Sequence, residues 1–194
     1  PTVMQCDYTS SYCYDIQLFG NCGRKAVWAN SVSIQAISRN TGFMRNKIVN
    51  ETGGPCTEMF MYEAAVGLMN HCVSGASKTT QPRAAGGRYT DYITPVECWW
   101  VGDVFKSCAG MTRKDANELA KKILPKYEAK LGHPDKGQSL TECFDLQKLQ
   151  AKPHYVELFN RVRNELIDMG MPLDKAFGET YMGFVADERK TINL

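Results

Sequence analysis

The segment of this 194-residue chain best suited to chemistry is Gly53-Gly54-Pro55-Cys56, which stands directly before a long apolar run. Glycine allows a backbone to approach a ligand closely, and proline is favoured at the first position of a helix. We therefore expect a loop that enters a helix at Pro55. The free N–H groups and positive dipole end of such a helix favour an anion or a polar reacting group. The same spacing is also typical of a loop that has only a structural role.

Acidic side chains lie on both sides of this segment. Glu51 precedes it, Glu58 and Glu63 follow it, and Asp7 comes after an expected strand near the amino end. A carboxylate at the end of a strand or the start of a helix can accept or deliver a proton. We take Glu51, Glu58 and Asp7 as candidate catalytic residues. The helix dipole gives Glu58 and Glu63 an alternative, structural role, because it stabilises negative charge near the start of a helix.

A second set of residues is assigned to substrate binding because the same loop, or the turn before the first helix, would present them. These residues are Asn50, Gly53, Gly54, Cys56 and Arg24. A cysteine at a helix start can have a lowered pKa and act as a thiolate or a metal ligand. The alternative, which we favour for Cys56, is a buried structural thiol.

The cysteines and histidines do not form a recognisable metal motif. The chain has eight cysteines and three histidines, without Cys-x-x-Cys or classical zinc spacing. Cys6, Cys56, Glu51 and His71 could supply zinc ligands in principle, but their spacing does not favour it. We predict no metal site.

Hydrophobic periodicity and turn residues predict the elements that position these side chains. In chain order they are a strand at residues 2–6, a tyrosine-rich loop at 8–14, a helix at 24–40, a strand at 43–49, a helix from residue 55 that is buried on more than one face, a loop at 75–87, a helix at 95–109, a helix at 113–131 kinked at Pro125, and a helix at 155–170. The helix at 24–40 has an expected apolar stripe of Val27, Trp28, Val32, Ala36 and Ile37. In a parallel α/β arrangement chemistry lies after the carboxyl ends of strands. Asp7 and residues 50–56 should therefore meet at one rim.

Charge and hydropathy exclude several classes of function. The 23 basic and 21 acidic side chains are interspersed, which does not indicate a nucleic-acid partner. The chain has no apolar stretch long enough to span a bilayer, and residues 1–13 lack the features of a signal peptide. We expect a cytoplasmic protein without membrane contact.

The sequence Gly-Gly-Pro-Cys-Thr-Glu-Met with Glu63 behind it resembles a segment of the monomethylamine methyltransferases of methylotrophic archaea. The resemblance runs without a gap from Arg24 to about Gly170. It includes Ser74-Gly75, Gly87, Thr90-Asp91, Glu97, Gly102, Ala109-Gly110, Tyr127-Glu128, Thr141-Glu142-Cys143-Phe144-Asp145 and the helix at 155–170.

The resemblance implies an α/β fold that is the C-terminal part of a (β/α)8 TIM-type barrel. A complete barrel needs about 250 residues, and members of the family are much longer than this chain. Residues 1–110 would supply the closing strands and helices of the barrel. Residues 111–194 would form a helical C-terminal region and tail.

The resemblance also implies an activity in methanogenesis, the transfer of a methyl group from a methylamine to the Co(I) of a corrinoid protein. The family's catalytic pyrrolysine would lie outside this chain, and the corrinoid is supplied by the partner protein rather than bound directly. Where the family has Gln followed by tyrosines, this chain has Ile48-Val49-Asn50-Glu51. That departure favours a related donor or a rearranged site.

Two alternatives remain open, a zinc-dependent methyltransferase for another methylated donor and a non-catalytic C-terminal fragment or scaffold subunit. The family forms homo-oligomers, and we expect one here. Apolar side chains of residues 95–109, including Trp99 and Trp100, or of residues 171–194 should form the subunit contact.

Overall fold

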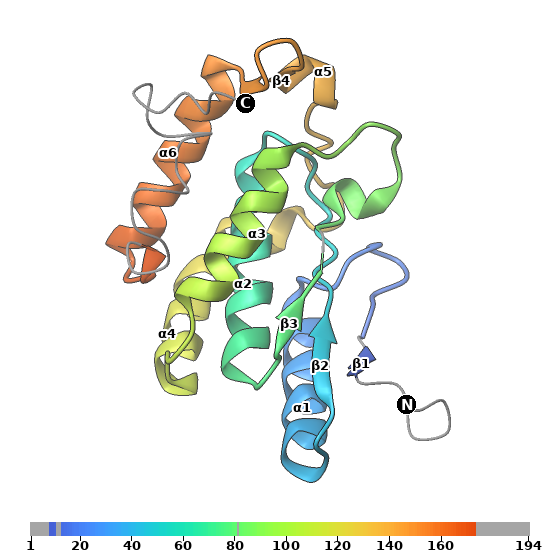
Figure 1. Cartoon of the computed structure of the whole chain (residues 1–194), viewed down its shortest axis with the longest axis vertical. Helices are drawn as coiled ribbons and strands as arrows, with labels where there is room; N and C mark the ends of the chain where they lie inside the picture. The colour runs from blue at the N-terminus through green and yellow to red at the C-terminus, as the bar shows by residue number, and fades with distance from the viewer. Residues whose placement is uncertain (1–7, 11–12, 81, 174–194) are drawn as a thin grey trace.

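The computed structural model describes residues 8–10, 13–80 and 82–173 (Figure 1). Its strands are β1 (Tyr8–Ser10), β2 (Met44–Lys47), β3 (Lys78–Thr79), β4 (Phe144–Asp145) and β5 (Gln150–Ala151). Its α-helices are α1 (Arg24–Asn40), α2 (Glu58–Val73), α3 (Pro95–Ser107), α4 (Arg113–Ile123), α5 (Leu140–Cys143) and α6 (Pro153–Asp168). Three 3-10 helices are η1 (Ala84–Gly87), η2 (Leu124–Lys126) and η3 (Glu128–Lys130). None of the helices in these described ranges is long and apolar enough to cross a membrane.

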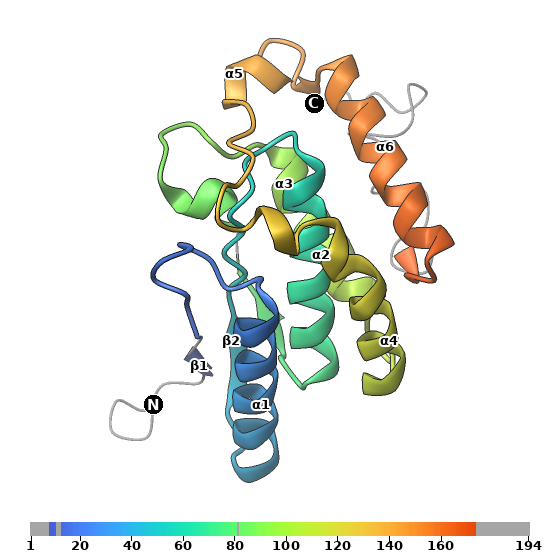
Figure 2. The same cartoon turned by 180° about the vertical axis from the view of Figure 1, so that it is seen from behind.

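A three-stranded parallel sheet in the order β1-β2-β3 organises the first half of the chain. Tyr8 pairs with Met44, and Asn46 pairs with Lys78. The alternation of strands and helices places α1 over one face of the sheet, as the views from the front and from behind show (Figures 1 and 2). Because the three strands are parallel, their carboxyl ends lie at the same edge of the sheet, which we call the rim.

Two segments that were expected to be loops contain strands. The strand expected at residues 2–6 lies outside the described residues, and the described strand β1 occupies Tyr8–Ser10, where a loop was expected. The loop expected at residues 75–87 contains β3 and η1. Strands of two or three residues carry too little periodic pattern to be recognised, because their pairing is set by distant residues.

Helix α2 is the centre of the molecule. It contacts α1, α3, α4 and α6, and its described residues from Met59 to Met69 are all buried. The predicted burial on more than one face is therefore confirmed. The predicted entry at Pro55 is wrong, because Thr57 is the N-cap: its Oγ1 accepts a hydrogen bond from Phe60 N at 3.1 Å.

Helix α1 has the predicted bounds but a different buried face. Trp28 is 68% exposed and Val32 is 46% exposed, whereas Val27, Asn30 and Ile34 are buried. Asn30 tolerates burial because its Nδ2 donates to Cys13 O and Ala26 O, and its Oδ1 accepts from Cys13 N. The buried face therefore contains the polar residue Asn30, and an apolar stripe chosen from hydrophobic residues alone is rotated away from that face.

The C-terminal helices pack on α2 and α3. The predicted helix start at Thr94 is confirmed by a capping box with Glu97. The helix expected at 113–131 ends at Ile123, and Pro125 lies in η2. The α-helix therefore ends before Pro125 and does not continue through it with a kink.

Trp100 is buried and lies edge-on to Phe159 of α6, with ring centroids 5.4 Å apart. Trp99 is partly buried against the same ring. The expectation that α3 keeps a large exposed apolar surface for subunit contact is therefore wrong, because α6 covers that surface. The other expected contact falls mostly on residues 174–194, which lie outside the described residues.

Candidate functional site

The candidate site is the buried segment of residues 50–57, which connects β2 to α2. Every residue of this segment is buried. Backbone hydrogen bonds fix it from two sides: Gly86 N donates to Glu51 O at 2.7 Å, and Asn21 N donates to Asn50 O at 3.1 Å. The segment lies beyond the carboxyl end of β2, where α/β barrels carry their catalytic groups.

Glu51 is fully buried, and only one of its carboxylate oxygens forms a hydrogen bond within the described part of the chain. Its Oε2 accepts a hydrogen bond from Arg83 N at 3.0 Å, whereas its Oε1 has no hydrogen-bond partner among the described residues. Burial raises the pKa of Glu51 well above its usual range, and the nearby carboxylates of Glu63 and Glu97 raise it further. Burial therefore favours the protonated form of Glu51 over its charged form.

Glu63 lies beside Glu51 and holds the loop. Its two carboxylate oxygens accept hydrogen bonds from Thr52 Oγ1 at 2.7 Å and from Gly53 N at 2.8 Å. Burial raises the pKa of Glu63 to about 7, although these hydrogen bonds oppose the rise. The sequence left Glu63 with two possible roles, proton transfer and a structural role at the helix dipole, and it was not among the candidate catalytic residues. The signal for a larger role was an acidic residue in the middle of the apolar run that follows Glu58.

Asn50 adds two more buried polar atoms to the candidate site. Its Oδ1 and Nδ2 are both buried and make no hydrogen bond to described residues. Its backbone is held by Asn21, whose Oδ1 accepts from Asn50 N at 2.8 Å and whose Nδ2 donates to Ile48 O at 2.9 Å. The positioning role of Asn21 depends on this pairing with a distant loop, which no local sequence pattern indicates.

Gly53 and Gly54 must lack side chains because other parts of the protein's own backbone pack against them. A Cβ on Gly54 would lie 1.7 Å from Lys136 O, and a Cβ on Gly53 would lie 2.8 Å from Phe60 N. Gly54 N also donates to Asp135 O at 2.8 Å. The close approach that the glycines allow is therefore to the 135–137 loop and to the start of α2.

Cys56 is a buried neutral thiol. Its backbone N donates to Glu97 Oε1 at 3.3 Å. Burial raises the pKa of the Cys56 thiol to about 12, with further contributions from the Glu97 and Asp135 carboxylates. A lowered pKa at this helix start is therefore not found, in agreement with the structural-thiol alternative.

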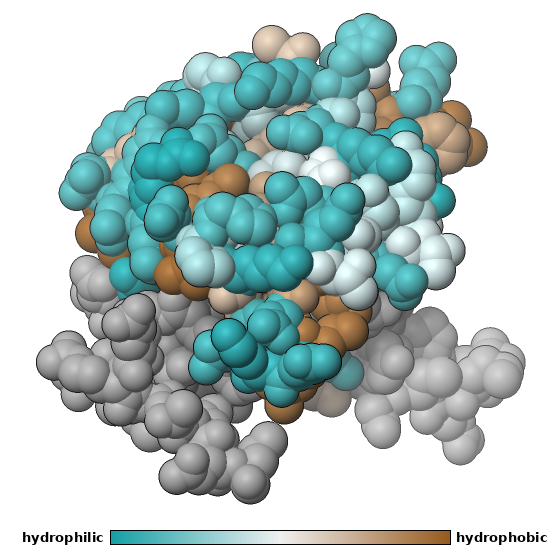
Figure 3. Space-filling model, turned by 90° about the horizontal axis from the view of Figure 1, so that it is seen from above, coloured by the Kyte–Doolittle hydropathy of each residue, from teal (hydrophilic) through white to brown (hydrophobic). Residues whose placement is uncertain are grey.

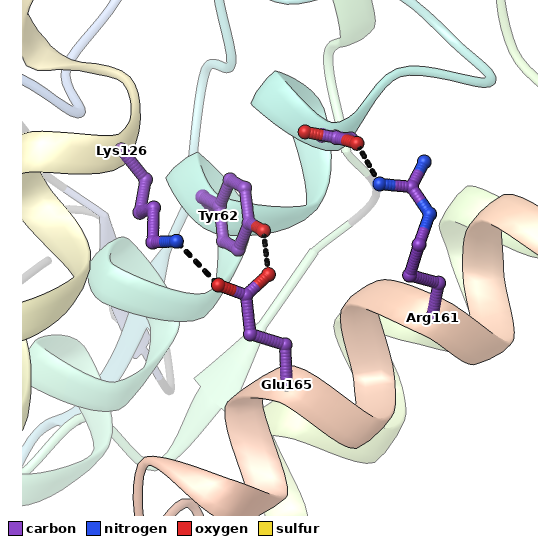
Figure 4. A network of polar contacts seen from close by, with 5 residues as sticks. Tyr62, Lys126, Arg161 and Glu165 are labelled. Atoms are coloured by element: carbon purple, nitrogen blue, oxygen red, sulfur yellow. Dashed lines mark hydrogen bonds and ion pairs between the residues drawn. The ribbon is translucent and has the colours of Figure 1, made fainter.

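Two of the other candidate residues lie apart from this cluster. Glu58 begins α2 with a partly exposed side chain that forms an ion pair with Arg161 of α6 (Figure 4). Arg24 begins α1 and pairs with Glu128, its Nη2 lying 2.8 Å from Oε2. Asp7 lies outside the described residues. The structure thus brings together Asn50, Glu51, Gly53, Gly54 and Cys56, with Glu63 added.

Comparison with known proteins identifies the chain. The family model described as "Monomethylamine methyltransferase MtmB" matches residues 1–171. The chain belongs to this family. It is 27% identical over 135 residues to Monomethylamine methyltransferase MtmB of Methanosarcina mazei and to MtmB1 of Methanosarcina acetivorans. The matched region covers 70% of this chain and 30% of each relative.

Solved structures of the family show the same fold. The crystal structure of the Methanosarcina barkeri monomethylamine methyltransferase MtmB and that of its hydroxylamine complex each superimpose with a TM-score of 0.81 at 23% identity. Each match covers 84% of this chain and 36% of the solved chain. The chain therefore spans about a third of its MtmB relatives, and its fold is the C-terminal part of a TIM-type barrel.

The residues considered as zinc ligands are not assembled by the described part of this MtmB-family chain. No group of three or more His, Cys, Asp and Glu side chains with metal-binding geometry occurs among the described residues. His71 is buried near Lys47, and burial lowers its pKa to about 3. Cys6 lies outside the described residues.

Proposed function

We propose that this chain forms the closing part of an enzyme that moves a methyl group from a methylamine to the cobalt of a corrinoid protein. Membership of the monomethylamine methyltransferase family supports the reaction class. The observation in the structure that supports it best is a set of polar atoms on Asn50 and Glu51, buried beyond the carboxyl end of β2, that have no hydrogen-bond partner among residues 8–10, 13–80 and 82–173. Because the chain spans about a third of its relatives, the activity is proposed for the complete protein.

Glu51 is proposed to supply a proton to the amine. When the C–N bond breaks, its electron pair remains on nitrogen, and an amine leaves poorly unless it is protonated. The cobalt of the partner protein supplies the electron pair for the new bond to carbon. Glu51 suits the role of acid because burial raises its pKa and so favours the protonated carboxyl, and because its Oε1 has no hydrogen-bond partner among the described residues.

Asn50 is proposed to orient the substrate, and Glu63 to position the loop. The Asn50 amide offers a donor and an acceptor in a site from which water is excluded, which suits a small polar group. Glu63 acts at a distance from the substrate, since both its carboxylate oxygens are used by Thr52 and Gly53. These roles would replace those of the Gln and tyrosines that the family resemblance leads one to expect.

The decisive experiment is an assay of the complete protein with a reduced corrinoid protein and a panel of methylamines, methanol and methylated thiols. We expect the cobalt absorbance spectrum to change with a methylamine only. A change with methanol or thiols instead, together with stoichiometric zinc, would favour the zinc-dependent alternative. No change with any donor would leave the scaffold alternative.

Glu51→Gln tests the proton-donor role in the same assay. The variant should slow the cobalt change at least about tenfold, because general acid catalysis typically contributes about 10²–10⁴-fold. Glu118→Gln, on the exposed face of α4, is the matched control and should react at the wild-type rate.

We also propose that the protein forms a homo-oligomer. Since α6 covers the apolar face of α3, residues 171–194 are the remaining segment on which this proposal depends. Light scattering at micromolar concentration tests it, and a monomeric mass would overturn it.

A further inference from the structure

A groove on the helix side of the sheet has no role in the proposed chemistry. It lies between residues 24–35 of α1 and residues 113–124, which comprise α4 and the start of η2, with residues 70–74 at the end of α2 between them (Figure 2). We call it the helix groove. Its cavity volume is about 350 Å³, and small-molecule sites typically have volumes of about 300–1,000 Å³. The helix groove is therefore large enough for a small ligand.

Each of the two walls of the helix groove is a single face of one helix. The residues on the α1 side are Arg24, Val27, Trp28, Ser31 and Gln35. Those on the α4 side are Arg113, Asn117, Ala120, Lys121 and Leu124. Residues at such spacings of three and four lie on one face of an α-helix. Apolar, amide and basic side chains of both helices therefore face the same groove.

Polar contacts join the two walls near both ends of the groove. Arg113 Nη1 donates to Gln35 Oε1 at 3.2 Å, and Arg24 forms its ion pair with Glu128 of η3. Since the start of α4 lies beside the end of α1, the two helices run in opposite directions. The groove between them is about 16 Å long, because an α-helix rises by about 1.5 Å per residue.

Trp28 is the largest exposed apolar side chain of the helix groove. It is 68% exposed, whereas Trp99 is partly buried and Trp100 is buried. On the face seen from above, by comparison, most of the described surface is hydrophilic and hydrophobic residues occupy small areas (Figure 3). The antiparallel walls place Trp28 opposite the turn of α4 that carries Ala120 and Lys121. An exposed indole in a groove offers a flat surface on which an aromatic ring can stack.

The charged residues that line the helix groove are all basic: Arg24, Arg113 and Lys121. Arg113 forms no ion pair with a residue that the structure describes, and its hydrogen bond to Gln35 leaves its charge uncompensated. Lys121 pairs with Glu118, but both side chains are exposed, and exposed ion pairs contribute little. Arg113 and Lys121 can therefore both turn to an anionic ligand.

We propose that the helix groove binds a small aromatic anion, a ring system that carries a carboxylate, sulfonate or phosphate group. The ring lies on Trp28, and the anionic group faces Arg113 and Lys121. A planar guanidinium binds such groups through two parallel hydrogen bonds. This inference does not rest on the proposed function, because none of the residues that line the groove belongs to the cluster of Asn50, Glu51 and Glu63.

The test is a fluorescence titration of the full 194-residue chain with anilinonaphthalene sulfonate, an aromatic sulfonate. We expect one probe to bind per chain and to quench the emission of the exposed tryptophan. Phenylnaphthylamine, which has the same rings without the sulfonate, is the matched neutral probe. It should bind at least about tenfold more weakly. Raised salt should weaken binding of the sulfonate but not of the neutral probe.

Variants of the groove locate the bound probe. Trp28→Ala and Arg113→Gln should each raise the Kd for anilinonaphthalene sulfonate about tenfold or more. Tyr89→Ala removes an exposed aromatic ring outside the groove, and Lys114→Gln removes the neighbouring exposed cation of α4. These two controls should leave Kd unchanged within about twofold. Circular dichroism must show that each variant remains folded.

Several results would overturn the proposal. They are the absence of binding to the wild type, equal affinity for the neutral probe, wild-type affinity in Trp28→Ala and Arg113→Gln, and an equal loss in the controls. Light scattering covers the case in which a second copy occupies the groove. Self-association that Trp28→Ala abolishes, without binding of the sulfonate, would also overturn the proposal. The result of the methyl-transfer assay has no bearing on it.

Discussion

Gly54 shows at the residue scale how closely the site loop is packed. Its backbone touches the carbonyl of Lys136, and no space remains for a side chain. Gly54→Ala should lower the free energy of unfolding by about 3 kcal/mol, because the 135–137 loop must move to relieve the contact. Urea denaturation followed by circular dichroism measures the change.

Gly102→Ala provides the control for this substitution. Gly102 lies within α3, and an added Cβ meets no atom within 4 Å. The variant should be more stable by about 0.5–1 kcal/mol, because alanine has the higher helix propensity. Equal effects of the two substitutions would show that the loop contact at Gly54 is not tight.

The stability of the protein should depend on pH through Glu63, whose carboxylate binds the same loop. Its carboxyl titrates near 4.5 when unfolded, and burial raises its pKa to about 7 in the folded protein. Between these values the folded state binds more protons, so stability falls as pH rises through this window and then levels off. One pKa unit corresponds to about 1.4 kcal/mol, so the contribution of Glu63 is about 3 kcal/mol.

Glu63→Gln should remove this contribution. The amide can still accept from Gly53 N and donate to Thr52 Oγ1, so the loop keeps its contacts. Measured against the wild type, the variant should gain about 3 kcal/mol between pH 4.5 and pH 8. Glu118→Gln should show no such trend, since ion pairing with Lys121 lowers the pKa of Glu118 below this window. A constant difference between Glu63→Gln and the wild type would contradict the raised pKa.

At the element scale, a polar network attaches α6 to the body of the molecule. Glu165 of α6 accepts hydrogen bonds from Tyr62 of α2 and Lys126 of η2 (Figure 4). Tyr62 is buried, whereas Lys126 and Glu165 remain partly exposed. The hydrogen bond from the buried phenol should therefore contribute more than the exposed ion pair.

Tyr62→Phe should lower the free energy of unfolding by about 1–2 kcal/mol. Lys126→Met should lower it by less than about 1 kcal/mol, and raised salt should reduce that effect further. Chemical denaturation of Tyr62→Phe, of Glu165→Gln and of the double variant would give the coupling between Tyr62 and Glu165. A coupling near zero would show that the network does not hold α6.

At the scale of the whole molecule, one hydrophobic core extends through both predicted regions, residues 1–110 and 111–194. The core includes α2 and α3 from the first region and α4 and α6 from the second. The contact between Trp100 and Phe159 joins them directly. We therefore expect a single cooperative unfolding transition.

Tryptophan fluorescence and far-ultraviolet circular dichroism should give the same urea midpoint. Phe159→Ala should lower that midpoint for both probes together, with a loss of about 3–5 kcal/mol. Two separate midpoints in the wild type would instead show that residues 111–194 unfold independently.

The sequence by itself determined the features that depend on local pattern. The bounds of α1, the all-round burial of α2 and the capping of α3 at Thr94 follow from hydrophobic spacing and from residues a few positions apart. The family also followed from the sequence, because several short identities in one register are specific.

The tertiary structure alone decided what depends on residues far apart in the chain. Glu51, Glu58 and Glu63 are similar carboxylates in sequence, but of the three only Glu51 and Glu63 are buried, and burial raises the pKa of each of these two. Trp28 is exposed and Trp100 is buried because α6 covers α3 and no described element covers that part of α1. Short strands such as β3 exist only through pairing with β2, and no local signal specifies that pairing.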